Sequence, residues 1–338
     1  MSTFCRFLGW LVVGLSLVLH LFTVYTFALQ PDRFAAFTVM PIWLWGGFGM
    51  LLCLGAFYFL RARFSLLMAG VWAVTLLVGA DEAHALLNIG KPPPLPGRAA
   101  PYEGSPTLRV VTLNCSTFIY GNPAADLAVW QPDIVLLQEV EPHLARQIAD
   151  TLYGGRGDLR FHAGNAIVTR WRITRDLPNT DRNRRALQVT VRTPGGQEME
   201  VVNIHLPSAS TDLRLWRKYA WSAHRVNRAT RLAELAVTRR FLAGSTHFPH
   251  KATILGGDFN APASDIVHRT LAPDLVDAFG AAGTGWGNTF QRRLPILRID
   301  HIYATRHFVP VRSRVVATRN SDHRMVIADF LAPTRRSH

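Results

Sequence analysis

The sequence predicts an α/β protein in which packed β-sheets are covered by helices, preceded by a membrane-helical N-terminal region. Two observations carry this prediction. The first 90 residues contain three long stretches without a charged side chain, and the remainder contains many short apolar segments separated by polar turns. The 338 residues allow about two domains. With 49% apolar residues and a mean hydropathy of +0.11, the composition excludes a disordered chain.

The uncharged stretches cover residues 7–31, 34–60 and 64–80 and predict transmembrane helices at about 7–29, 40–60 and 64–80. A helix that crosses a bilayer needs roughly 17–25 apolar residues, so the first two are long enough and the third lies at the lower limit. The first is too long for the apolar part of a signal peptide and lacks a clean cleavage site. For the third, a buried or interfacial helix is the alternative.

Basic residues flank these stretches unevenly. Arg6 precedes the first, and Arg61 and Arg63 lie between the second and third, whereas Arg33 is the only basic residue in the first turnaround. Cytoplasmic flanks of membrane helices are enriched in Lys and Arg. The N-terminus is therefore predicted inside the cell and, after three crossings, the rest of the chain outside.

A proline-rich segment, residues 91–106, follows the third apolar stretch. Its six Pro and two Gly cannot form a helix or a central strand, and they predict a semi-rigid extended linker. It leaves residues 107–338 as one large domain with a well-buried core.

The chain carries 37 Lys and Arg against 23 Asp and Glu, a net charge of +14. Residues after position 98 contribute 31 of the basic and 20 of the acidic side chains. This balance favours an anionic partner, and nucleic acid, an anionic lipid surface and a phosphorylated substrate all remain open. Cys115 is the one cysteine in residues 107–338, which excludes a disulfide and a cysteine-based zinc site within that domain.

Short apolar segments in residues 107–338 predict strands, and several of them are apolar on both faces, as in sheets covered by helices. These segments are residues 108–113, 134–137, 166–169, 186–191, 199–204, 253–255, 299–303 and 326–330. Helical patterns are clearest at 216–242 and 142–152. In the longer one, Arg225, Arg228 and Arg231 recur at helical spacing and predict either a solvated face or a face that attracts anions.

Polar side chains of the types used in catalysis follow or precede these strands directly. They are Asn114, Gln138, Glu139, Asn203, His205, Asp258, Asn260, Asp300, Ser321, Asp322 and His323. Each by itself has an ordinary structural explanation as a cap, a turn residue, a surface charge or a core histidine. Because strand ends that converge on one rim form the binding site of α/β sheets, their joint occurrence predicts a single pocket.

These motifs, in this order, resemble the endonuclease/exonuclease/phosphatase superfamily over essentially the whole of residues 107–338. The superfamily includes exonuclease III-like nucleases, neutral sphingomyelinases, inositol polyphosphate 5-phosphatases and bacterial YafD-like proteins. The resemblance implies a four-layer α/β sandwich of two mixed β-sheets flanked by helices. One position departs from it: nucleases of the family often have Asn-x-Asp after the first strand, and here Ser116 follows Asn114-Cys115. Ser116 cannot act as a carboxylate ligand of a metal.

The resemblance also implies a metal cofactor and a reaction. The reaction is hydrolysis of a phosphoester or pyrophosphate with the help of Mg2+ or Mn2+, and Mg2+ prefers oxygen ligands. Glu139 is implied as the metal anchor, with help from Asn114 and Asp322. The resemblance implies a Mg-dependent enzyme of the phosphodiesterase, phosphatase or endonuclease class.

The remaining motif residues are implied in the chemical step. Asp258 would accept a proton from the attacking water, and Asn260 would orient that water or a phosphate oxygen. Asp300 would hold His323 as a cation that neutralises charge at phosphorus. His205 would lie near the leaving oxygen. Asn114 is also implied as a catalytic residue.

The substrate is left open by the family, whose members act on DNA, lipids and inositides. Apolar helices, linker and catalytic domain together resemble the YafD-like and VanJ-like membrane proteins, which implies a multi-pass protein of the bacterial cytoplasmic membrane. The expected substrate then lies outside the cytoplasm. It is a polyprenyl pyrophosphate, another lipid-linked phosphate or a phospholipid. A nuclease on extracytoplasmic DNA is the alternative, with Trp216, Trp221 and Trp286 available for stacking. A third hypothesis is an inactive, membrane-tethered binding module, supported only by Ser116.

Overall fold

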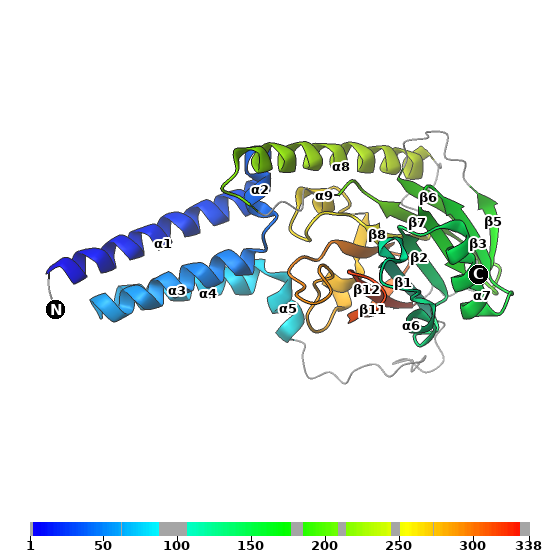
Figure 1. The fold of residues 1–338 in the computed structure, drawn as a ribbon, viewed down its shortest axis with the longest axis horizontal. Helices are drawn as coiled ribbons and strands as arrows, with labels where there is room; N and C mark the ends of the chain where they lie inside the picture. The colour runs from blue at the N-terminus through cyan, green and yellow to red at the C-terminus, as the bar shows by residue number, and fades with distance from the viewer. Residues whose placement is uncertain are drawn as a thin grey trace, which may run out of the picture.

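The computed structural model describes residues 3–61, 63–87, 107–176, 185–208, 214–244, 251–272 and 274–331. The linker predicted at 91–106 lies outside the described residues. Figure 1 shows long N-terminal helices that extend to one side of a domain built from strands and shorter helices.

The N-terminal part is helical, as predicted. Its elements are α1 (Thr3–Leu29), η1 (Asp32–Phe34), α2 (Ala35–Thr38), α3 (Ile42–Leu60), α4 (Arg63–Gly79) and α5 (Asp81–Leu87). Among the described residues, two helices are long and apolar enough to cross a membrane, and α4 with α5 forms a third candidate that is bent by 81°. Large apolar side chains such as Phe7, Leu21 and Leu51 are exposed on these helices, as expected of surfaces that face lipid.

Two six-stranded mixed sheets form the core of the domain. The first has the strand order β11-β12-β1-β2-β4-β3 and the second the order β5-β6-β7-β8-β10-β9. Strands β1 and β2 pair in parallel, as do β7 and β8, and the other pairs are antiparallel. The strands are β1 (Thr107–Asn114), β2 (Ile134–Gln138), β3 (Asp158–His162), β4 (Asn165–Thr169), β5 (Arg172–Asp176), β6 (Ala186–Arg192), β7 (Glu198–His205), β8 (Thr253–Asp258), β9 (Leu275–Asp277), β10 (Asp300–Thr305), β11 (Val309–Ala317) and β12 (Arg324–Leu331).

The two sheets pack face to face with helices outside them. Fully buried residues of both inner faces, including Val110 and Leu136 from one sheet and Val201 and Ile254 from the other, form one cluster. Helices α6 (Ala124–Ala128) and α7 (Pro142–Tyr153) cover the first sheet. Helices α8 (Lys218–Gly244) and α9 (Ile266–Arg269) cover the second, and the short α10 (Ala278–Ala282) precedes β10. The predicted four-layer α/β sandwich is confirmed.

The N-terminal helices contact the domain through buried polar groups. Arg228 of α8 is fully buried and donates to the carbonyl of Gln30 and the hydroxyl of Thr38, and it pairs with Asp265 at 3.2 Å. Arg231 is also buried. The interpretation of the arginine face of this helix as solvated or anion-attracting is therefore wrong for these two residues, because both are buried next to Asp265 and Arg228 also contacts the turnaround between α1 and α3.

Two of the tryptophans considered for nucleic-acid stacking also lie at this contact. Trp221 packs edge-on against Phe34, and Trp286 packs edge-on against Trp43. Trp216 alone among the three is largely exposed, at 78%. Two of the rings that the nuclease hypothesis would need are thus in contact with aromatic residues of the N-terminal helical region.

Candidate active site

The predicted site residues come together at the ends of strands from both sheets. Asn114 ends β1, His205 ends β7 and Asp258 ends β8, while Asp300 begins β10 and His323 directly precedes β12. A cavity of about 520 Å³ lies between these ends, and its lining includes Glu139, His205, Asp258, Asn260, Asp322 and His323. Asn114 and Asp300 lie behind this lining and are almost fully buried.

Unusual backbone conformations place two of these side chains. Glu139 and Asn260 both have a φ of 49°, in the left-handed region, where the chain turns sharply after β2 and β8. Gly257, with a φ of 136°, packs so closely that a Cβ would lie 1.9 Å from the carbonyl oxygen of Ile204. The Gly-Gly-Asp-Phe-Asn motif therefore needs glycine at this position to bring Asp258 to the cavity.

Asp258 is buried and held by neighbouring amides. Its Oδ1 accepts from the backbone N–H of Asn260 at 2.8 Å, and its Oδ2 accepts from the side-chain amides of Asn114 at 3.0 Å and Asn260 at 3.2 Å. Burial and the nearby carboxylate of Asp300 raise the pKa of Asp258, although His323 and His205 and the bond from Asn114 oppose the rise. A fixed carboxylate with a raised pKa is suited to accept a proton.

Asn114 joins this carboxylate to the other one in the cavity. Its Nδ2 donates to Glu139 Oε1 as well as to Asp258 Oδ2, both at 3.0 Å. Its Oδ1 accepts from the backbone N–H of Ser116 at 2.9 Å, which fixes the orientation of the amide. In this orientation Asn114 positions two carboxylates and turns its oxygen away from them, so the geometry favours its catalytic assignment over metal ligation.

His205 lies between the same two carboxylates. Its Nε2 is 3.7 Å from Glu139 Oε1 and 3.8 Å from Asp258 Oδ2, and its side chain is partly exposed to the cavity. These distances exceed a hydrogen bond, so the imidazole remains available to a group that enters the cavity.

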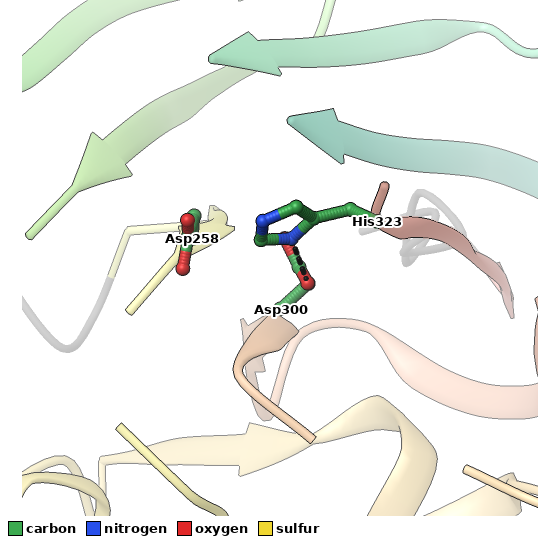
Figure 2. Close-up of side chains that lie close together, drawn as sticks. All are labelled: Asp258, Asp300 and His323. Atoms are coloured by element: carbon green, nitrogen blue, oxygen red, sulfur yellow. Dashed lines mark hydrogen bonds and ion pairs between the residues drawn. The ribbon is translucent and has the colours of Figure 1, made fainter. Parts of the chain in front are cut away.

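His323 and Asp300 form a buried pair beside Asp258 (Figure 2). His323 Nδ1 lies 2.9 Å from Asp300 Oδ2. Burial alone would disfavour the charged imidazolium, but Asp300, with Asp258 and Asp322 nearby, outweighs it and raises the pKa of His323 to about 10. This raised pKa favours the cationic form of His323 at neutral pH, paired with the Asp300 carboxylate.

A divalent metal fits the donors at this site. Ligand atoms of Asp258, Asp300 and His323 lie within 4.8 Å of one another, so this group could hold an ion. Asp300 Oδ1 is buried without a hydrogen-bond partner among the described residues. However, a protonated His323 has no lone pair to offer a metal. Glu139, whose side chain is 36% exposed and lines the cavity, is the more accessible carboxylate for a cation.

Ser116 has a structural partner that sequence reasoning missed. Its Oγ donates to Asp322 Oδ1 and also contacts the hydroxyl of Ser321. Ser321 in turn donates to the carbonyl oxygen of Asn114 at 2.6 Å. The residue that replaces a carboxylate of the nuclease pattern thus holds Asp322 in place. The pairing joins segments about 200 positions apart, which no local pattern indicates.

Two further residues near the site have roles that the sequence did not indicate. Arg185 lines the cavity, and its guanidinium lies 3.7 Å from Glu234. Asn203 is fully buried and donates from β7 to the carbonyls of Leu137 and Ala166 in the other sheet. It fixes the two sheets relative to each other at the rim that carries the site. Its place at the end of an apolar strand was visible in the sequence, but its cross-sheet role was not.

Comparisons with known proteins agree with this fold. A model of the Endonuclease/Exonuclease/phosphatase family matches residues 111–323. A protein of that description from Bacteroides thetaiotaomicron has a similar structure, with a TM-score of 0.54 and 16% identity, covering 69% of this chain and 100% of that one. At such identity the similarity shows the fold alone.

Two further similar structures have printed activities or ligands. A mannosyl-6-phosphatase from Bacteroides thetaiotaomicron has a TM-score of 0.52 and 17% identity, covering 66% of this chain and 99% of its own. TDP2 of D. rerio, complexed with a single strand DNA product, has a TM-score of 0.51 and 17% identity, covering 66% and 98%. No curated protein matches the chain at a significant level.

Proposed function

Because the chain belongs to the Endonuclease/Exonuclease/phosphatase family, we propose that it is a membrane-anchored, Mg2+- or Mn2+-dependent phosphohydrolase. Its substrate is a lipid-linked phosphate or a phospholipid outside the cytoplasm. The observation that carries this proposal is that the catalytic domain rests directly on the ends of helices apolar enough to cross a membrane, through the buried contacts of Arg228 with Gln30 and Thr38.

The residues of the cavity divide the chemical work. Glu139 and Asp322 would hold the metal, which would supply positive charge to the phosphoryl oxygens when bound. A water attacks phosphorus, its proton passes to Asp258, and the bond from phosphorus to the leaving oxygen breaks. The His323 imidazolium neutralises the charge that develops on the phosphoryl oxygens. Asn260 keeps Asp258 in place and orients the water or a phosphate oxygen.

The remaining groups support these roles. Asp300 keeps His323 charged, and Asn114 donates hydrogen bonds to the carboxylates of Glu139 and Asp258. His205 lies near the leaving oxygen. The cavity contains all of the acid, base and cation groups that this hydrolysis needs, which argues against an inactive binding module.

A nuclease is the second candidate, and the net charge of the chain together with the DNA-bound TDP2 structure favours it. Two tryptophans that could stack on bases are packed against the apolar helices instead. The arrangement of apolar helices ahead of the catalytic domain is similar to the YafD-like and VanJ-like membrane proteins, which supports the lipid-type substrate.

The direct test uses the full chain in detergent micelles with Mg2+, assayed against a polyprenyl pyrophosphate, a sphingomyelin and plasmid DNA. We expect phosphate or headgroup release from a lipid substrate, and no release by the Asp258→Asn variant. Cleavage of DNA with no turnover of either lipid would replace the proposal by the nuclease. No turnover of any substrate by wild-type protein would count against hydrolysis.

A further inference from the structure

Much of the lining of the catalytic cavity is apolar. Beside the carboxylates and histidines, the lining includes Ile119, Tyr120, Leu294, Ile296 and Leu297. Leu294 is 73% exposed and Ile119 is 77% exposed, although both are large apolar residues. A phosphorylated sugar offers hydroxyl groups, which these side chains cannot satisfy. The lining therefore suits a substrate with an apolar group next to its phosphate.

One lining residue comes from the membrane region. Val39 belongs to the turnaround between α2 and α3, is 4% exposed, and lines the same cavity as Asp258 and His323. It is the only lining residue from the N-terminal helical region among those that the structure describes. The catalytic cavity thus extends to the level at which the apolar helices end.

A second cavity adjoins the first. It has a volume of about 270 Å³ and shares Pro262, Ile296 and Leu297 with the lining of the first. Its other lining residues include Phe27 and Ile42, where two of the apolar helices end or begin, Gly79 at the end of α4, and the charged residues Asp81, Glu82, Arg269 and Arg298. Three shared residues thus separate the catalytic groups from a space that borders the membrane-side helix ends.

We propose that this apolar lining binds a hydrocarbon chain attached to the scissile phosphate, and that the chain enters from the membrane side past Val39. The inference rests on the proposed function and names the part of the substrate that the cavity recognises. Each methylene removed from water tightens binding roughly fourfold. A ligand with an eight-carbon chain should therefore bind this lining much more tightly than a ligand with a two-carbon chain. The recognised chemistry is a phosphate on an alkyl or prenyl chain, whether the molecule is free or in a bilayer.

The test measures binding of two probes, ethylphosphonate and octylphosphonate, to the full chain in detergent micelles with Mg2+, by calorimetry. Octylphosphonate should bind wild-type protein at least about tenfold more tightly than ethylphosphonate. Leu294→Gln should reduce that advantage roughly tenfold while leaving the affinity for ethylphosphonate unchanged. Val226→Gln is the matched control, because Val226 is 55% exposed on α8 and does not line the cavity, so it should bind both probes like wild type.

The outcomes separate this inference from the proposed function. If both phosphonates bind wild-type protein with equal affinity, or if Leu294→Gln and Val226→Gln behave alike, the chain-binding lining is wrong and the phosphate site stands. If neither probe binds, the phosphate site itself fails, and the inference fails with it.

The membrane-side entry has its own readout. An octylphosphonate with a photoreactive diazirine at its chain end should label Val39 and residues 290–297, and excess ethylphosphonate should compete for that label. Adducts confined to the outward faces of the apolar helices, or unaffected by the competitor, would overturn the path past Val39.

Discussion

Asp258 and His323 need opposite charges in one cavity, and their immediate neighbours supply both. Asn114 and Asn260 donate to the Asp258 carboxylate, while Asp300 accepts from His323. Each of the two side chains is therefore fixed by hydrogen bonds to neighbouring residues, of which Asn114 and Asp300 are almost fully buried. At the residue scale, the site depends on these fixed pairs more than on any single side chain.

The two carboxylates of the cavity should respond differently to loss of charge. Glu139→Gln keeps the size of the side chain but weakens metal binding, so part of the activity should return at high Mg2+ concentration. Asp258→Asn removes the proton acceptor, so activity should fall about 10²–10⁴-fold and stay low at any Mg2+ concentration. Initial rates over a Mg2+ titration, beside thermal melts, measure both. Full activity of Asp258→Asn would refute its role as base.

The pH profile should report the His323–Asp300 pair. The pKa of His323 is raised to about 10, so its cation is present at neutral pH and is lost as the pH rises through that value. Asp300→Asn removes the charge that raises this pKa, so the alkaline limb of the activity profile should move to lower pH by roughly 1–3 units. Profiles of wild type and variant at saturating Mg2+ test this. An alkaline limb that does not move would show that His323 does not control it.

The elements that sequence patterns missed share one position in the fold. Strands β3, β5, β9 and β11 were not predicted, and each lies at an edge of its sheet. Edge strands are half covered and tolerate charge, as in β11, where Arg312 and Arg314 alternate with smaller residues. The central strands are buried on both faces, so their apolar runs were clear in the sequence.

Helix α8 shows that a helical pattern in the sequence does not reveal which face of the helix is buried. Its arginine spacing was visible, but burial of Arg228 depends on the turnaround between α1 and α3. Arg228→Met should destabilise the protein by about 3 kcal/mol, because it leaves the Asp265 carboxylate poorly compensated in a buried position. Arg225→Met, at an exposed position of the same helix, should change stability by less than about 0.5 kcal/mol.

Thermal melts of the full chain in detergent compare these two variants. Equal melting temperatures for Arg228→Met and Arg225→Met would mean that the contact between the domain and the turnaround contributes little to stability.

At the scale of the whole molecule, buried polar contacts join the domain to the apolar helices. Besides Arg228, Arg298 donates to Asp81 at 2.7 Å and to Asp277 at 2.6 Å, which ties the bend between α4 and α5 to the second sheet. Beside the buried Arg298, the half-buried Asp277 has its pKa held well below its usual range even though desolvation opposes this. These contacts fix the position of the cavity relative to the ends of the apolar helices.

Topology is the matching prediction at this scale. Arg6, Arg61 and Arg63 predict an N-terminus inside the cell, so a reporter enzyme fused after residue 106 should be active only outside the cytoplasm. A fusion after Arg61 is the control and should report the cytoplasmic side. Activity of the first fusion in the cytoplasm would overturn both the sidedness and much of the case for an extracytoplasmic lipid substrate.

The sequence by itself determined the apolar helices, the central strands and the acidic, amide and imidazole residues at their ends. These features are local, since apolar runs and strand-end motifs are read within a few neighbouring residues. The family resemblance followed from the order of those motifs, and the predicted site residues meet at one rim as expected.

Only the tertiary structure decided which partners these residues have. Ser116 holds Asp322, Asn203 joins two sheets, Arg228 is buried, and Val39 reaches the catalytic cavity from a turnaround between apolar helices. The physical reason is that each of these contacts joins segments far apart in the chain or on different layers. The local sequence determines the chemical groups available at each position, and the packing of distant elements determines which groups contact one another.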